Sequence, residues 1–292
     1  MSPSSFKTAG AFLFCAMAIV GSARAQLDIS LRMPNTTLLR GEPVPAVVTI
    51  QNNTAAQIPV GGNNGYNLSF DLRDSDSHSI LPNEENPLFT LPLAPGATLV
   101  ITNDLFRCFK LMGLQQASIM AHADYAGRSY TSKRFFLDFQ GGTEIARLQV
   151  SSGKETLAHI FLVLRRGAHE HLFLRVDDEA GGWTYGATDL GTILRSVPPQ
   201  FMLDSSGHTH MLQRSGPEEY SYRIAAADGT ILKHELFRGD YRIIRMSAAP
   251  DGTITVNGKA AEIGERPAVL PATPMRPDLH RPMQQDSAPH AP

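Results

Sequence analysis

The sequence predicts an all-β protein of two small domains that follow a leader peptide. Apolar and polar residues alternate with a period of two through much of the chain, as in half-buried strands. Turn-forming Gly, Pro, Asn and Asp recur every 8 to 15 residues. No segment after residue 25 has the spacing of an amphipathic helix. Together these features favour antiparallel sheets joined by short turns.

Residues 1–25 have the composition of a secretory signal peptide. Lys7 precedes an apolar run from Ala9 to Val20, and Ala23-Arg24-Ala25 supplies small residues before a cleavage point. The run is shorter than the roughly 18 apolar residues that a membrane helix needs, and no later segment reaches that length. We therefore expect a periplasmic or secreted protein without a membrane span, beginning at Gln26.

The net charge limits the kinds of binding partner to expect, and the cysteine count limits the possible disulfides. The chain has 26 Lys and Arg against 28 Asp and Glu, and the leader holds two of the basic residues and no acid, so the mature net charge is −4. Without a basic stripe, nucleic acid and anionic membranes are not expected partners. Cys108 is then the only cysteine, which rules out an intramolecular disulfide and favours a small buried apolar role.

Residues 26–140 are expected to form the first domain. The alternation is clearest at the start, where Leu27, Ile29 and Leu31 face one side and the residues between them are polar. Strands are predicted over 27–33, 44–50, 68–72, 89–93, 97–101, 117–125 and 130–139. About seven short strands in about 115 residues are typical of an antiparallel sandwich.

Four short blocks in this region carry a resemblance. They are Arg40-Gly41-Glu42-Pro43-Val44, Ile50-Gln51-Asn52-Asn53-Thr54, Leu93-Ala94-Pro95-Gly96 and Asn103-Asp104-Leu105. Residues 26–140 thereby resemble the immunoglobulin-like or macroglobulin-like sandwich modules of bacterial exported proteins. The resemblance implies a fold and is nearly silent on activity. A small exported proteinase-inhibitor family shares these strand and turn patterns, although no inhibitory loop can be matched.

Residues 145–264 are expected to form a second all-β domain. Asp228-Gly229 predicts a hairpin with a two-residue turn. His169-Glu170-His171-Leu172 recurs 39 residues later as His208-Thr209-His210-Met211, a spacing typical of four-stranded propeller blades. Too few copies fit to close a propeller, so blade-like hairpins are predicted instead. Residues 265–292 are Pro-rich and predicted to be a disordered tail.

The two His-x-His units are the sharpest chemical feature. Residues two apart on a strand face the same side, so His169 with His171, and His208 with His210, could each present two imidazoles to one metal. Both units lie beside turns, and Glu170 faces the opposite side of its strand. We interpret these histidines as structural, with a metal site as the alternative. Added metal should then leave the melting temperature unchanged.

Other candidate residues are aromatic or acidic. Trp183, Tyr185, Tyr220 and Tyr222 could form a platform for a sugar or peptide, although core packing is the commoner role of alternating aromatics. The acids at 71, 74, 76, 84 and 85 allow an irregular calcium site, but an EF-hand loop starting at Asp74 would need Gly where Ser79 stands. The acidic run 177–179 adjoins glycines, which favours a loop over a catalytic pair.

The functional prediction follows from these patterns. No phosphate loop, dinucleotide fingerprint or Gly-x-Ser-x-Gly elbow is present, so no catalytic residue and no cofactor is assigned. We expect an exported non-enzymatic module, structural or ligand-binding, whose partner is an unidentified protein or carbohydrate of the cell envelope. The alternatives are an extracellular sugar- or peptide-processing enzyme and a proteinase-inhibitor-like module.

Overall fold

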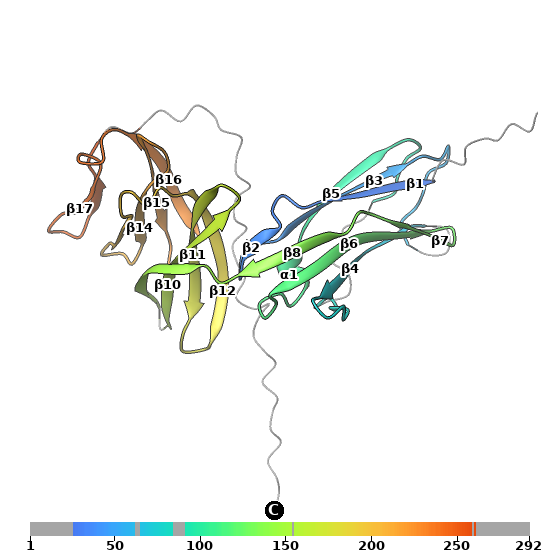
Figure 1. Cartoon of the computed structure of the whole chain (residues 1–292), viewed down its shortest axis with the longest axis horizontal. Helices are drawn as coiled ribbons and strands as arrows, with labels where there is room; N and C mark the ends of the chain where they lie inside the picture. Colours follow the sequence, from blue (N-terminus) through green and yellow to red (C-terminus); the bar gives the residue numbers. More distant parts are fainter. Residues whose placement is uncertain (1–25, 62–64, 84–90, 154, 259, 261–292) are drawn as a thin grey trace, which may run out of the picture.

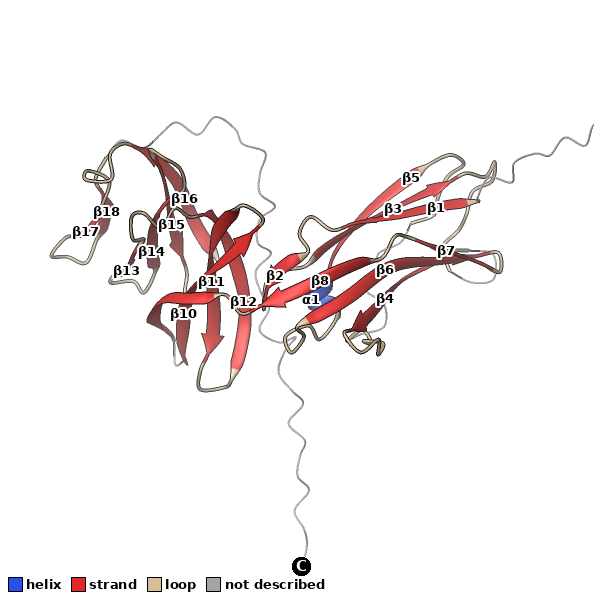
Figure 2. Cartoon of the chain, viewed as in Figure 1, coloured by secondary structure: helices blue, strands red, loops and turns tan. Residues whose placement is uncertain are grey.

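The computed structural model describes residues 26–61, 65–83, 91–153, 155–258 and 260. The predicted leader, 1–25, and the predicted tail, 265–292, lie outside the described residues. Within them the regular structure is almost entirely β, and the helix α1 (Leu105–Cys108) is a single turn (Figure 2). The prediction of an all-β protein is confirmed. No helix in this part of the chain is long and apolar enough to cross a membrane.

The first half of the chain begins with a three-stranded antiparallel sheet. Its strands, in spatial order, are β1 (Leu27–Arg32), β3 (Pro45–Asn52) and β5 (Thr98–Asp104). Burial in β1 alternates strictly, with Leu27, Ile29 and Leu31 inside and the residues between them exposed. The predicted period of two is therefore the period of burial, since successive side chains point to opposite faces of a sheet.

A second sheet lies face to face with the first (Figure 1). Its strands are β2 (Thr37–Leu39), β8 (Phe135–Gln140), β6 (Gln116–Tyr125) and β4 (Asn67–Asp74), in this spatial order, with β7 (Arg128–Thr131) also paired to β6. All pairs are antiparallel except β2 with β8, which is parallel. One core of residues between 27 and 139 joins the two sheets into a sandwich, and half-buried Cys108 packs against that core.

Two predicted strands differ from the structure. The strand expected over 130–139 is divided into β7 and β8, which both pair with β6 on either side of residues 132–134. At this break the Ser132 N–H still donates to the Ala121 carbonyl at 2.9 Å, but the Ala121 N–H donates to the Ser132 hydroxyl at 2.9 Å, so a side chain replaces one backbone bond of the ladder. The strand expected over 89–93 is reduced, within the described residues, to a bridge between Leu93 and Ile58.

The second half contains two consecutive four-stranded antiparallel sheets in which chain neighbours are sheet neighbours. The first comprises β9 (Thr143–Ser152), β10 (Glu155–Arg166), β11 (His169–Asp178) and β12 (Trp183–Thr192). The second comprises β13 (Gln200–Leu203), β14 (Thr209–Arg214), β15 (Glu219–Ala225) and β16 (Ile231–Arg238). A two-stranded sheet, β17 (Met246–Ala248) with β18 (Ile254–Val256), follows.

The two four-stranded sheets pack face to face, and other parts of the chain pack against the outer face of each. Phe161 of β10 and Phe201 of β13 stack with ring centroids 3.8 Å apart in the core between the two four-stranded sheets. Met246 and Ile254, from β17 and β18, join the core on the far side of the second sheet. Leu39 from the sandwich joins the core on the far side of the first. Both faces of each blade-like sheet can therefore be buried without a closed propeller.

Two details of the predicted second half are wrong. The repeat of 39 residues aligns His169 and His171 on β11, the third strand of its sheet, with His210 on β14, the second strand of the next. The matching strands by position are β10 and β14, so the repeat does not mark equivalent sites. The hairpin at Asp228-Gly229 is present, but its loop spans 226–230, because Ala226 and Thr230 close it with a backbone hydrogen bond.

Candidate functional site

The four candidate histidines do not converge. β11 and β14 lie in different sheets, His169 is exposed, and the Nδ1 of His171 lies 3.0 Å from an oxygen of Asp189. His208 and His210 instead share Asp204, whose Oδ2 lies 3.2 Å from one ring and 3.0 Å from the other. The alternative in which all four imidazole rings bind one metal ion therefore does not fit the positions of these histidines.

A buried network surrounds His210. Its Nε2 donates to Asp204, and its Nδ1 lies 2.6 Å from the Tyr222 hydroxyl, which donates to it. Burial opposes the charge on Asp204, but hydrogen bonds from His210, His208 and Ser206 outweigh this and lower its pKa to about 2. Burial, with nearby Glu235 and Asp204, raises the pKa of Tyr222 to about 12. A tyrosine so hard to ionise is suited to fixing a hairpin rather than to attacking a substrate.

The aromatic candidates do not form an exposed platform. Tyr220 and Tyr222 are 2% and 4% exposed and belong to the core beneath β17 and β18. Trp183 and Tyr185 are half-buried, and Tyr185 packs against the core between the four-stranded sheets. Packing against neighbouring strands buries Tyr220 and Tyr222 and half-buries the other two rings. The period of two in the sequence does not show which face of a strand is covered.

The acidic run at the end of β11 is engaged in local contacts. Asp177 accepts hydrogen bonds from Arg175 and from Thr184 across the hairpin. Glu179 accepts from Gln149 at 3.0 Å and also from Arg147. These bonds tie β9, β11 and β12 together. No carboxyl of this run is among the residues that line the pocket of the sandwich described below.

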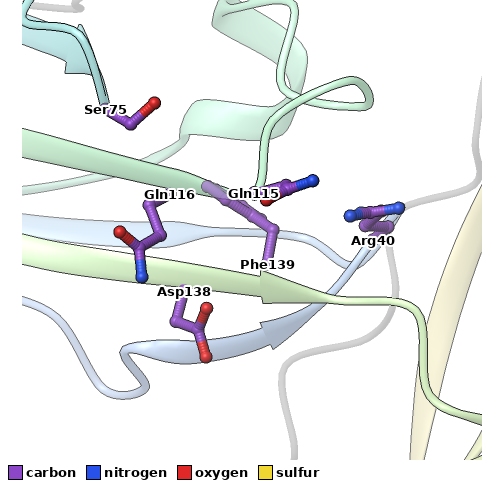
Figure 3. Close-up of a pocket in the computed structure, with 6 residues that line it drawn as sticks. All are labelled: Arg40, Ser75, Gln115, Gln116, Asp138 and Phe139. Atoms are coloured by element: carbon purple, nitrogen blue, oxygen red, sulfur yellow. The ribbon is translucent and has the colours of Figure 1, made fainter.

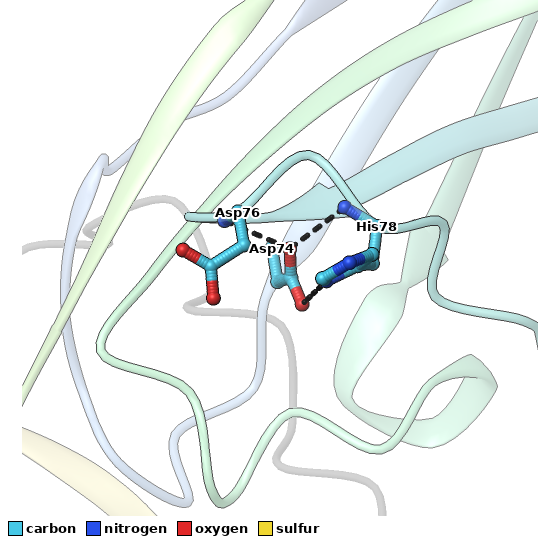
Figure 4. Close-up of side chains that lie close together, drawn as sticks. All are labelled: Asp74, Asp76 and His78. Carbon is cyan, nitrogen blue, oxygen red and sulfur yellow. Dashed lines mark hydrogen bonds and ion pairs between the residues drawn. The ribbon is translucent and has the colours of Figure 1, made fainter.

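The acidic residues for which a calcium site was considered include Asp74 and Asp76, which lie at the end of β4 and in the turn that follows it. Asp74, Asp76 and His78 are, within the described residues, the one group of three such side chains with ligand atoms inside 4.8 Å (Figure 4). Asp74 Oδ1 accepts the backbone N–H groups of Asp76 and His78, and its Oδ2 pairs with the His78 ring at 3.4 Å. Asp71 pairs with arginines instead. Residues 84 and 85 lie outside the described residues.

The same turn occurs again in the second half of the chain. In 204–208, as in 74–78, an aspartate accepts two backbone N–H groups, and a histidine four residues later contacts its second oxygen. The residue before each histidine has a positive φ, +66° for Ser77 and +81° for Gly207. Because the second copy has Ser206 where the first has Asp76, the shared feature is a turn-stabilising Asp–His pair.

A polar pocket lies at one end of the sandwich (Figure 3). It has a volume of about 220 Å³ and is lined by Arg40, Ser75, Gln115, Gln116, Asp138 and Phe139. These residues come from the ends of β2, β4, β6 and β8, and the pairing of Gln116 with Asp138 sets the two side by side. The pocket is smaller than the ~300–1,000 Å³ of cavities for drug-sized ligands, so it suits one small polar group or ring.

Arg40 is the distinctive group of this pocket. Its backbone N–H donates to the carbonyl of Gln140, which anchors the residue. Its side-chain Nε is buried and has no hydrogen-bond partner among the described residues. The Asp138 carboxylate is meanwhile occupied by the Gln140 amide at 2.6 Å. The pocket wall therefore includes a guanidinium, a group with several N–H donors that can bind an acceptor from outside the chain.

The loop that carries Arg40 also joins the two halves of the molecule. Gly41, at φ +91°, directs its carbonyl to the N–H of Ala187 on β12 at 2.7 Å. Glu42 is buried and pairs with Arg166 of β10, which also donates to Asp189 at 2.8 Å. The Arg166 guanidinium lies 4.7 Å from the centre of the Phe173 ring. Residues 40–43 thus form a junction between the sandwich and the second half of the chain. Arg40 lines the pocket, and Glu42 belongs to an ion cluster with Arg166 and Asp189.

Glu42 should make stability depend on pH. Burial raises its pKa from 4.5 to about 7, and the Arg166 guanidinium and the Leu39 N–H offset only part of this. Because the folded pKa is the higher one, the contribution is fully present below pH 4.5 and is lost as pH rises through about 7. We expect Glu42→Gln to flatten the fall in unfolding free energy between about pH 5 and pH 8 in urea titrations.

Exposed Glu218 provides the control for this measurement. Glu218→Gln should reproduce the wild-type pH profile, because this exposed side chain takes no part in the cluster of Glu42, Arg166 and Asp189. A Glu42→Gln profile parallel to that of the wild type would contradict the assignment.

Sequence reasoning missed the pocket almost entirely. In the sequence, Arg40 is only one residue of a block that resembles a sandwich module, and Gln115 and Gln116 lie just before the strand predicted over 117–125. Their meeting depends on which strands pair. The available signal was Phe136, an aromatic residue in phase with the polar positions Asp138 and Gln140 of its strand.

Comparisons with known proteins add little. No protein-family model matches the sequence, and no curated protein matches it. Among solved structures, the chain is similar to a cycloalternan-forming enzyme from Listeria monocytogenes in complex with a pentasaccharide substrate, with 11% identity and a TM-score of 0.22. The match covers 74% of this chain but 20% of that one. A TM-score of this size shows no shared fold, so the immunoglobulin-like resemblance of residues 26–140 stays a prediction.

Proposed function

We propose that this protein is an exported, non-catalytic binding module of the cell envelope or exterior, and that the pocket around Arg40 holds a small polar ligand. The observation that carries the proposal is the lining of the pocket, which brings the Arg40 guanidinium together with two glutamines, a serine and Asp138. A guanidinium forms charge-assisted hydrogen bonds, which are stronger than hydrogen bonds between neutral groups.

The pocket lining supports recognition over reaction. A guanidinium, two amides, a hydroxyl, a carboxylate and a phenyl ring can fix a ligand by hydrogen bonds and contact. A nucleophile with an adjacent base is not among the lining residues. A hydrolase panel on the mature protein tests the rival enzyme, and turnover abolished by Asp177→Asn or Glu179→Gln would favour it.

Export is part of the proposal and rests on residues 1–25. Its basic start, apolar run and small-residue end support cleavage after Ala25. Amino-terminal sequencing of the protein recovered from a bacterial envelope fraction should give Gln26 as the first residue. Recovery of an uncleaved chain from the cytoplasm would contradict this part.

Arg40→Ala should abolish most of the pocket's affinity. A charged hydrogen bond contributes about 1.5–3 kcal/mol, so the dissociation constant should rise roughly 10- to 100-fold. The measurement is calorimetry with a panel of neutral sugars, amino acids and small carboxylates. Arg128→Ala is the matched control, since exposed Arg128 pairs with Tyr125 at the opposite end of β6 from the pocket residue Gln116. Equal loss in both variants, or no binding in the wild type, would refute the proposal.

A further inference from the structure

Phe136 is an exposed aromatic residue of the second sheet of the sandwich. It lies on β8 between half-buried Phe135 and buried Leu137, and Phe136 itself is 74% exposed. The residues that share its face of the strand, Asp138 and Gln140, are polar. This ring gives an otherwise polar sheet face one flat apolar contact surface.

Strand register places this ring beside the pocket. Phe136 pairs with Ser118, and Asp138 pairs with Gln116, so both pairs share the outer face of β6 and β8. Two residues along a strand correspond to about 7 Å. The pocket residues Gln116 and Asp138 are therefore the next neighbours of the ring along the sheet.

The other side of the ring is bordered by a fixed polar cluster. Arg134 donates to the Ser118 hydroxyl at 3.0 Å and to Asp71 at 2.9 Å. Arg73, which pairs with Ser118 across β4 and β6, also donates to Asp71 at 2.9 Å. The exposed ring is thus a single apolar platform between charged groups, rather than part of a continuous apolar groove.

We propose that this outer face binds an oligosaccharide, with one sugar ring stacked on Phe136 and the next in the Arg40 pocket; the inference rests on the proposed function and deepens it. A sugar ring has an apolar C–H face, which suits a phenyl ring, and hydroxyls at its edge, which suit amides, a carboxylate and a guanidinium. An apolar peptide would need a wider apolar surface than one ring. A net charge of −4 on the chain without residues 1–25 does not favour a polyanionic ligand.

The test is calorimetry with cellotetraose, maltotetraose and chitotetraose, each compared with its monosaccharide. We expect at least one tetrasaccharide to bind, and Phe136→Ala to weaken it roughly tenfold while leaving the monosaccharide affinity unchanged. Phe136→Tyr should retain the affinity because the ring is kept. Tyr241→Ala removes an exposed aromatic of the second half, 43% exposed, and should have no effect. Arg40→Ala should weaken both ligands.

The outcomes separate the two proposals. Arg40-dependent binding of an amino acid or carboxylate, with no sugar bound, keeps the proposed function and overturns the saccharide inference. Tetrasaccharide binding that is identical in wild type and Phe136→Ala overturns the stacking role. No binding of any ligand in the whole panel refutes both. Unchanged melting temperatures in the Phe136 and Tyr241 variants show that the folded protein was compared, since exposed side chains contribute little to stability.

Discussion

Replacing Arg166 with Met should destabilise the protein by about 3–5 kcal/mol, because the buried Glu42 carboxyl loses its guanidinium partner and Asp189 loses one of its two side-chain partners. Arg166 is 9% exposed and contacts Glu42, Asp189 and the Thr37 carbonyl. The loss should appear in urea unfolding as a lower midpoint with little change in slope.

Arg165 provides a matched control next in the chain. It is exposed, and its Nε donates to the carbonyl of Gly167 at 3.3 Å. Arg165→Met should change the unfolding free energy by less than about 0.5 kcal/mol. The double variant Glu42→Gln with Arg166→Met should be less destabilised than the sum of its single variants, because removing a charge from both partners leaves less charge buried. An Arg166→Met variant within 1 kcal/mol of wild type would show that the cluster does not hold the junction.

Phe161→Ala should lower the free energy of unfolding by about 3–5 kcal/mol. Phe161 is fully buried between the two four-stranded sheets and stacks on Phe201. Truncating it opens a cavity where strands 40 residues apart in sequence meet, and a close-packed interior refills such a space only in part. Differential scanning calorimetry should show a clear drop in melting temperature.

Phe136→Ala is the control for this experiment because it removes the same side chain from an exposed site. Its stability should stay within about 0.5 kcal/mol of wild type. Equal destabilisation in the two phenylalanine variants would contradict the burial that separates them. The pair also distinguishes the two roles of phenylalanine here, core packing at 161 and ligand contact at 136.

Local sequence determined the strands and most turns. The alternation of Leu27, Ile29 and Leu31 predicts β1 because one residue in two must face the core, and this needs no knowledge of the strand's partner. The turn between β17 and β18 follows from Pro250-Asp251-Gly252, where Gly252 has a φ of +83°. Such features are short-range, so a single segment contains the information.

Tertiary structure alone decided the pocket, the junction and the fate of the candidate residues. Arg166 and Glu42 are 124 residues apart, and nothing near either one indicates the other. The same period of two buries Tyr222 and exposes Phe136, because a strand shows which side chains share a face but not which face is covered. Covering a face depends on the sheets that pack against it, and that packing is settled by long-range contacts.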